Sequence, residues 1–210
     1  MRNPLLSLLF LFVAGYAGIC AYLYFQQRAM LYFPQFTRVA ASETDFSLVR
    51  DGATLRGWTV NPGQPRAILY FGGNAESVQH NRDSFVRWFP HSTVYLLAYR
   101  GYGASDGKPD ERALFADALA LYDHVHKAHP GMPISVLGRS LGSAVASHVA
   151  ARRAVERLAL VTPFDSMTEV ARAHYPWLPV RMLIKDGYAS NLAVAKYRGP
   201  VLVVRAGQDQ

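Results

Sequence analysis

The chain has 210 residues, of which half are hydrophobic and 18% are charged, and its formal net charge is +7. This composition allows one sizeable core and shows no bias towards disorder or repeats, and a single cysteine, Cys20, excludes an intrachain disulfide. The arginines are scattered, without the basic run that would indicate nucleic acid. We therefore interpret the positive charge as a property that attracts the domain to an anionic membrane surface.

An apolar run without a charged residue extends over 22 residues from Pro4 to Phe25. At ~1.5 Å per residue, a helix of this length crosses a hydrocarbon core of about 30 Å. A cleaved signal peptide is the alternative, but its apolar core is usually about 7 to 15 residues long. We predict a transmembrane anchor with its flanks at residues 1–27 and a folded domain at residues 28–210. The basic residues that flank the anchor are nearly balanced, and we favour an amino terminus inside and a domain outside the cytoplasm.

The domain alternates the patterns of strands and helices. Asp51-Gly52 favours a tight turn between two strands, Phe46 to Arg50 and Ala53 to Val60, so an antiparallel hairpin opens it. After Pro109, apolar residues from Leu114 to Val125 recur with helical spacing. The alternation predicts an α/β fold whose mostly parallel sheet is flanked by helices and binds ligands at the carboxyl ends of its strands. Five further runs have the length and composition of buried strands: Ala67 to Phe71, Thr93 to Ala98, Ile134 to Leu137, Leu158 to Val161 and Val201 to Val204.

The regular pattern is interrupted before the last of these strands, where His174, Pro176 and Pro179 break any helical period. We interpret residues 165–199 as a small cap over the site. A surface connection that contains an ordinary helix is the alternative.

Gly138-Arg139-Ser140-Leu141-Gly142 lies between a predicted strand and a helical run. This is the strand, sharp turn and helix context of a nucleophile elbow, in which the glycines remove Cβ atoms that would clash in a strained turn. We predict Ser140 as the nucleophile. The amide of Leu141, at the start of the helix, is placed to donate to the oxyanion that acyl transfer creates.

Two further site residues follow other strands. The turn Gly72-Gly73-Asn74 lets the backbone approach closely, and we assign the second oxyanion donor to the amide of Asn74, although the glycines alone would also close an ordinary tight loop. Asp209 follows the last strand, where a hydrolase triad carries its carboxylate, although it also fits a simple loop residue.

None of the histidines fits the catalytic base, because in this chain order the base follows the acid and only Gln210 follows Asp209. His148 shares a helix face with apolar residues, which predicts a core histidine. His174, in the predicted cap, is a weaker candidate for contact with substrate. His124, His126 and His129 cluster at the end of a helix without matching cysteines or carboxylates, so we predict solvated side chains and no metal site.

Together these residues resemble the α/β-hydrolase superfamily, and within it the membrane-anchored, abhydrolase-domain branch described as serine aminopeptidase-like. The resemblance implies a serine hydrolase that cleaves ester, thioester or amide bonds through an acyl-serine intermediate. Its roles fall on Ser140 as nucleophile, Asp209 as acid and the amides of Asn74 and Leu141 as oxyanion donors. The segments that carry it are Arg28-Ala29-Met30-Leu31-Tyr32-Phe33-Pro34, Gly73-Asn74-Ala75, Tyr99-Arg100-Gly101-Tyr102-Gly103-Ala104-Ser105-Asp106-Gly107, the elbow at Ser140, Thr162-Pro163-Phe164-Asp165-Ser166 and Gly207-Gln208-Asp209.

The resemblance also implies a strand, a histidine loop and a closing helix after the acid. We therefore expect that the sequence is truncated, that the catalytic histidine is not present in this chain and that the 210 residues have little turnover. The expected partners are a small-molecule or lipid-like acyl substrate and a membrane, with no nucleic acid, metal or cofactor. A non-catalytic, membrane-tethered binding protein that retains the fold is the alternative function.

Overall fold

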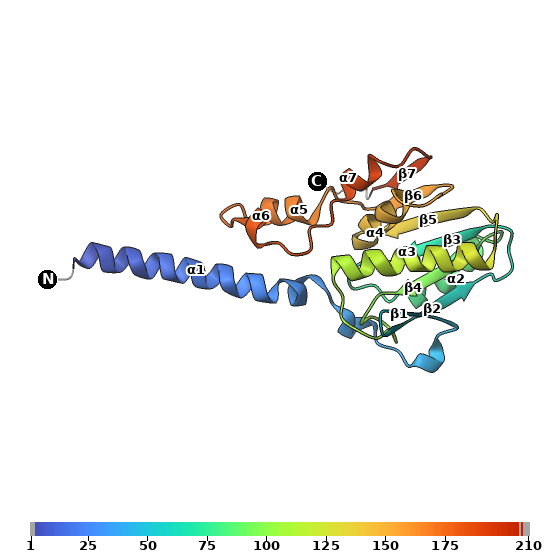
Figure 1. Cartoon of the computed structure of the whole chain (residues 1–210), viewed down its shortest axis with the longest axis horizontal. Helices are drawn as coiled ribbons and strands as arrows, with labels where there is room; N and C mark the ends of the chain where they lie inside the picture. The colour runs from blue at the N-terminus through green and yellow to red at the C-terminus, as the bar shows by residue number, and fades with distance from the viewer. Residues whose placement is uncertain (1–2, 206, 208–210) are drawn as a thin grey trace.

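A seven-stranded sheet forms the centre of the domain in the computed structural model, which describes residues 3–205 and 207 (Figure 1). The strand order is β1-β2-β4-β3-β5-β6-β7. β2 pairs antiparallel with both β1 and β4, and all other neighbours are parallel. The strands are β1 (Phe46–Arg50), β2 (Ala53–Val60), β3 (Ala67–Phe71), β4 (Thr93–Ala98), β5 (Ile134–Arg139), β6 (Leu158–Val161) and β7 (Val201–Val204). The mostly parallel α/β fold is confirmed.

The strands lie where the apolar runs predict them, with one difference. β5 extends two residues past Leu137, because Gly138 still pairs with β3 and β6 and Arg139 pairs with Val161. The first hairpin turns at Asp51 and Gly52, whose φ angles of 46° and 72° are those of a turn matched to strand twist.

Helices pack on the sheet and bury its core. The helices are α1 (Pro4–Leu31), α2 (Arg82–Trp88), α3 (Glu111–Ala128), α4 (Leu141–Ala150), α5 (Met167–His174), α6 (Val180–Leu183) and α7 (Ser190–Val194). α3 begins where the side chain of Asp110 accepts from the amide of Ala113 at 2.8 Å, and the face predicted from Leu114 to Val125 is buried. α4 contacts β3, β5 and β6 and packs against α3, and nine of its ten residues are buried. It is the helix that directly follows Ser140.

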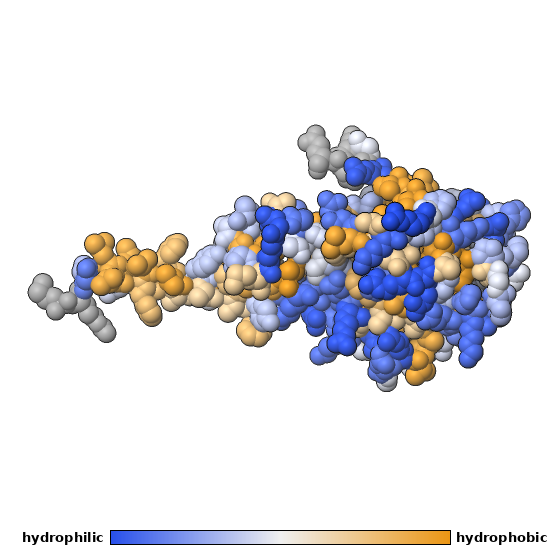
Figure 2. Space-filling model, turned by 45° about the horizontal axis from the view of Figure 1, so that its top comes forward, coloured by the Kyte–Doolittle hydropathy of each residue, from blue (hydrophilic) through white to orange (hydrophobic). Residues whose placement is uncertain are grey.

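α1 projects from the domain as a long apolar rod (Figures 1 and 2). By length and composition it is able to cross a membrane, with a mean hydropathy of 2.1 over its most apolar stretch. The helix continues to Leu31, beyond the predicted anchor boundary at residue 27, and the chain then enters the core at Tyr32, which is 3% exposed. The end of α1 is therefore packed against the domain.

The region predicted as a cap, residues 165–199, folds as three short helices that pack against two different parts of the chain. The α5–α6 segment, residues 167–186, lies beside α1, whereas α7 packs on α4. Tyr188, between these two parts, is fully buried, and its hydroxyl lies 2.6 Å from that of Tyr32. The region thus connects α1 to α4.

A buried ion pair on α3 offers a test of this packing. The carboxylate of Asp117, 1% exposed, accepts two hydrogen bonds from Arg100, at 2.6 and 2.8 Å. Asp117→Asn leaves the Arg100 charge without its buried partner, and we expect a loss of about 3–5 kcal/mol in the free energy of unfolding. Asp123 on the same helix makes a similar two-bond pair with Arg153, but its side chain is 54% exposed, so Asp123→Asn serves as control and should cost less than about 1 kcal/mol. Denaturant unfolding in detergent measures both, and equal losses would contradict the packing.

Candidate active site

Ser140 occupies the sharp turn between β5 and α4 with φ +49° and ψ −119°. A residue with a side chain is sterically strained at these backbone angles, so the surrounding contacts have to hold it there. The Ser140 amide donates to the carbonyl of Val161 at 2.9 Å, and the Ser140 carbonyl accepts from both the amide and the hydroxyl of Ser143, at 2.8 and 2.6 Å. The turn is fixed on both sides.

The two glycines of the elbow are required by close backbone contact. A Cβ atom on Gly138 would overlap the carbonyl of Gly142, and one on Gly142 would overlap the carbonyl of Phe71 at the end of β3. Because neither glycine has a Cβ atom, the start of α4 can approach the loop after β3. A Cβ atom on Gly73 in that loop would lie 3.7 Å from the Cβ of Ser140, so the two predicted halves of the site are neighbours.

The loop after β3 is organised by Glu76, which sequence reasoning missed. One carboxylate oxygen accepts from the amide of Gly73 at 2.8 Å, and the other accepts from the Tyr70 hydroxyl at 2.5 Å and the Asn81 side chain at 2.6 Å. The available signal was a carboxylate three residues after a glycine turn, a spacing at which a side chain can close the loop. Glu76 thus fixes the peptide that precedes Asn74.

Asn74 is held by the end of α1. Its side-chain amide donates to the carbonyl of Leu31 at 3.0 Å, while its carbonyl accepts from the Tyr102 hydroxyl at 2.6 Å and from the amide of Phe33 at 3.3 Å. Within residues 3–205 and 207, the amides of Asn74 and Leu141 have no hydrogen-bond acceptor. The structure therefore brings Ser140, Leu141 and Asn74 together at the carboxyl ends of β5 and β3, whereas Asp209 lies outside the described residues.

None of the seven histidines is hydrogen-bonded to Ser140, and all seven belong to the described part of the chain. The ring of His148 stacks on Phe115 at 3.8 Å, and burial, reinforced by Arg152 and Arg153, lowers the pKa of His148 to about 4. His174 is exposed, and its Nδ1 lies 2.9 Å from the carbonyl of Val170. His124, His126 and His129 are also exposed, at the end of α3.

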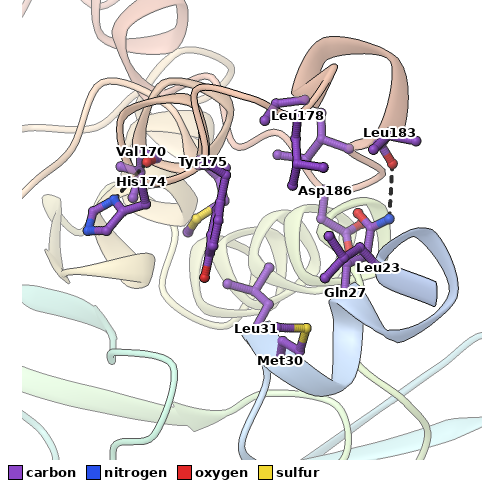
Figure 3. A pocket seen from close by; sticks show the side chains of 14 residues that line it. Leu23, Gln27, Met30, Leu31, Val170, His174, Tyr175, Leu178, Leu183 and Asp186 are labelled. Carbon is purple, nitrogen blue, oxygen red and sulfur yellow. Dashed lines mark hydrogen bonds between the residues drawn. The ribbon is translucent and has the colours of Figure 1, made fainter. Parts of the chain in front are cut away.

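An apolar cavity of about 330 Å³ opens between α1 and the α5–α6 segment (Figure 3). Ser140 does not line it, but Leu31 does, and the carbonyl of Leu31 accepts the side-chain hydrogen bond of Asn74. The cavity therefore ends beside the candidate oxyanion loop. Its lining from α1 consists of Leu23, Gln27, Met30 and Leu31, and opposite them lie Met167, Val170, Ala171, His174, Tyr175, Leu178, Val180, Leu183, Ile184 and Asp186.

The mostly parallel sheet and its flanking helices are those of an α/β-hydrolase. Residues 64–206 match the family model of serine aminopeptidase, S33, and the chain belongs to this family. It is 35% identical to an uncharacterized protein of Mycobacterium tuberculosis, over 92% of this chain and 73% of that protein. It is 37% identical to the lysophosphatidylserine lipase ABHD12 of Danio rerio, over 68% of this chain and 43% of the lipase. A solved α/β-hydrolase from Vibrio vulnificus has the same fold, with a TM-score of 0.64 and 22% identity over 75% of this chain and 61% of that structure.

The close approach at Gly142 predicts a large effect of a single methyl group. Gly142→Ala would place a Cβ atom on the Phe71 carbonyl, so β3 and α4 must separate, and we expect a loss of at least about 1–3 kcal/mol in the free energy of unfolding. Gly18→Ala is the control, because nothing lies within 4 Å of a Cβ atom there. Thermal unfolding of the detergent-solubilised chain compares the two, and an unchanged midpoint for Gly142→Ala would contradict the contact.

The partly buried His148 predicts a specific sensitivity to acid. Its pKa of about 4 in the folded chain lies below the ~6.5 of an unfolded histidine, so protonation favours unfolding and stability falls as the pH drops from about 6.5 to about 4. His148→Gln should reduce this loss, whereas the same change at the exposed His129 should not. Unfolding midpoints across this pH range measure the difference, and parallel curves for wild type and His148→Gln would contradict the assignment.

Proposed function

We propose that this chain is a membrane-anchored serine hydrolase that cleaves an ester, thioester or amide bond of a lipid-like acyl substrate. The observation that carries the proposal is the strained Ser140 turn beside two backbone amides that donate to no acceptor in the described part of the chain. Residues 1–27 form the anchor with its flanks, and residues 28–210 belong to the hydrolase domain.

In the proposed reaction, the Ser140 hydroxyl attacks the substrate carbonyl and the proton leaves to a base. The amides of Asn74 and Leu141 stabilise the oxyanion, supported by the positive end of α4. The intermediate collapses to an acyl-serine and expels the alcohol, thiol or amine, which takes up the proton from the base. Water then hydrolyses the acyl-serine to the free acid and restores the Ser140 hydroxyl. Asp209 is proposed as the acid of the triad, and the base is assigned to none of the seven histidines in the 210 residues.

The lipid-like substrate is proposed from two observations. The name of the Danio rerio relative states that it acts on lysophosphatidylserine, a single-chain lipid. The cavity beside Asn74 is lined mainly by apolar side chains and has the volume of a small-ligand pocket. We place the domain outside the cytoplasm, with the amino terminus inside.

The competing function is a membrane-tethered binding protein that keeps the fold without catalysis. It would use the apolar cavity beside α1 without chemistry at Ser140. Both proposals use the same cavity, so only the reactivity of Ser140 separates them.

Chemical rescue provides the test, because soluble imidazole can replace a missing histidine as base. We expect the chain to react with a fluorophosphonate probe slowly alone and several-fold faster with imidazole, with the adduct on Ser140 by peptide mapping. Ser140→Ala should abolish labelling. Ser77→Ala removes another hydroxyl close to the same loop and should leave labelling unchanged. A folded chain that gives no Ser140 adduct with imidazole would overturn the enzyme proposal in favour of the binding protein.

A further inference from the structure

The α5–α6 segment extends along α1 as far as the middle of the helix. The hydroxyl of Tyr16 donates to the carbonyl of Trp177 at 2.9 Å, and the centroids of their rings are 6.4 Å apart. Tyr16 is twelve residues after Pro4, the first residue of α1, or about 18 Å along the helix axis. The tip of the segment therefore lies beside the middle of the anchor, not at its end.

The part of α1 that the α5–α6 segment does not cover is too short to cross a bilayer by itself. The hydrocarbon core is about 30 Å thick, whereas the helix from Pro4 to Tyr16 supplies only about 18 Å. If α1 spans the membrane, about 12 Å of the core has to overlap the α5–α6 segment. A tilted helix would increase this overlap, because tilt shortens the span along the membrane normal.

The surface of the segment suits such a position. Its exposed side chains include Tyr175, Trp177 and Met182, with 45%, 53% and 83% of their surface accessible. Aromatic residues with a polar edge favour the membrane interface, and apolar side chains favour the hydrocarbon below it. The charged side chains of α5 and α6 are paired within the segment, since Glu169 contacts both Arg172 and Arg181. Lys185 lies at the end of the segment nearer the domain, where its amide donates to the side chain of Gln27 and its ammonium can reach lipid headgroups. The ammonium of Lys185 lies 3.9 Å from the centre of the Tyr24 ring.

The cavity lies between these two elements, nearer the domain than the contact of Tyr16 with Trp177. Its first lining residue on α1 is Leu23, about 10 Å from Tyr16 along the helix axis. Leu23 and Met30 of α1 face Leu178 and Leu183 across it, as Figure 3 shows. Its inner end is at Leu31, next to the loop that holds Asn74. If the hydrocarbon core begins at Pro4, its roughly 30 Å ends close to Leu23, so the cavity begins at the edge of the core and continues towards the candidate site. Its mainly apolar lining is complementary to the hydrocarbon chain of a lipid.

We propose that the α5–α6 segment is a second membrane-contacting element, immersed in the near leaflet against α1, and that the cavity between them receives one acyl chain directly from that leaflet. The membrane contact is independent of catalysis. The interpretation of the acyl chain as part of a substrate rests on the hydrolase function proposed above. Both experiments below therefore use Ser140→Ala, which allows binding without turnover.

The depth of Trp177 is measured by tryptophan fluorescence of the full chain in phospholipid vesicles whose acyl chains carry bromine, a short-range quencher. We expect quenching that is mostly lost in Trp177→Phe and retained in Trp88→Phe. Trp88 is the matched control, since it is 66% exposed but lies on α2 in the sheet domain. Unchanged quenching in Trp177→Phe, or quenching of Trp177 by aqueous iodide instead, would overturn the membrane contact.

The acyl chain is located by a lysophospholipid that carries a photoreactive diazirine in its chain, incorporated into the same vesicles. Adducts are expected on cavity residues such as Met30 and Leu178, and Ala171→Phe, which fills the cavity, should reduce them several-fold. Ala173→Phe on the exposed side of the same helix should not. Adducts on the lipid-facing start of α1 serve as the internal standard. Adducts confined to that part of α1 would overturn the cavity as an acyl site, whatever the result of Ser140 labelling.

Discussion

The arrangement of the candidate site depends on one close contact, between the start of α4 at Gly142 and the end of β3 at Phe71. Only a residue without a side chain permits it, and the contact brings the turn at Ser140 against the loop at Gly73. The strained φ of Ser140 is maintained because Val161 and Ser143 hold its peptide groups from opposite sides. The nucleophile candidate is thus fixed by the packing of helix on sheet, and not by its own side chain.

A second dependence runs from the site to the anchor. Asn74 is hydrogen-bonded to Leu31 and Phe33 at the end of α1, and Tyr32 between them is buried against Tyr188. The end of α1 is therefore part of the domain's packing, and its orientation is transmitted to the loop that carries the proposed oxyanion donor. A flexible tether would leave the site free to face any direction, whereas this connection would hold the site at a fixed height above the membrane that α1 is proposed to span.

The sequence predicts the elements whose cause is local. Continuous apolar runs identify the strands, and the glycines at Gly138 and Gly142 identify the turn, because each pattern depends on neighbours along the chain. It does not predict the pair of Arg28 and Asp186, whose side chains are joined by two hydrogen bonds of 2.9 and 3.1 Å across 158 positions. Nor does it predict the path of the α5–α6 segment, whose short helices are positioned by contact with α1 and not by their own periodicity. The roles assigned to Ser140, Asn74, Leu141 and Asp209 stay predictions.

The pair of Arg28 and Asp186 also limits where the proposed membrane surface can lie. The Arg28 side chain is 46% exposed, and a charged group with that exposure belongs at the level of headgroups and water. Tyr16 lies twelve residues away, about 18 Å deeper along α1, so this second measure again places Trp177 inside the hydrocarbon. Leu31 and the Asn74 loop lie just above Arg28. A lipid in the near leaflet would then keep its ester bond at the height of the proposed site while its acyl chain follows α1 downward through the cavity, so that only a small displacement would separate the resting lipid from the bound one.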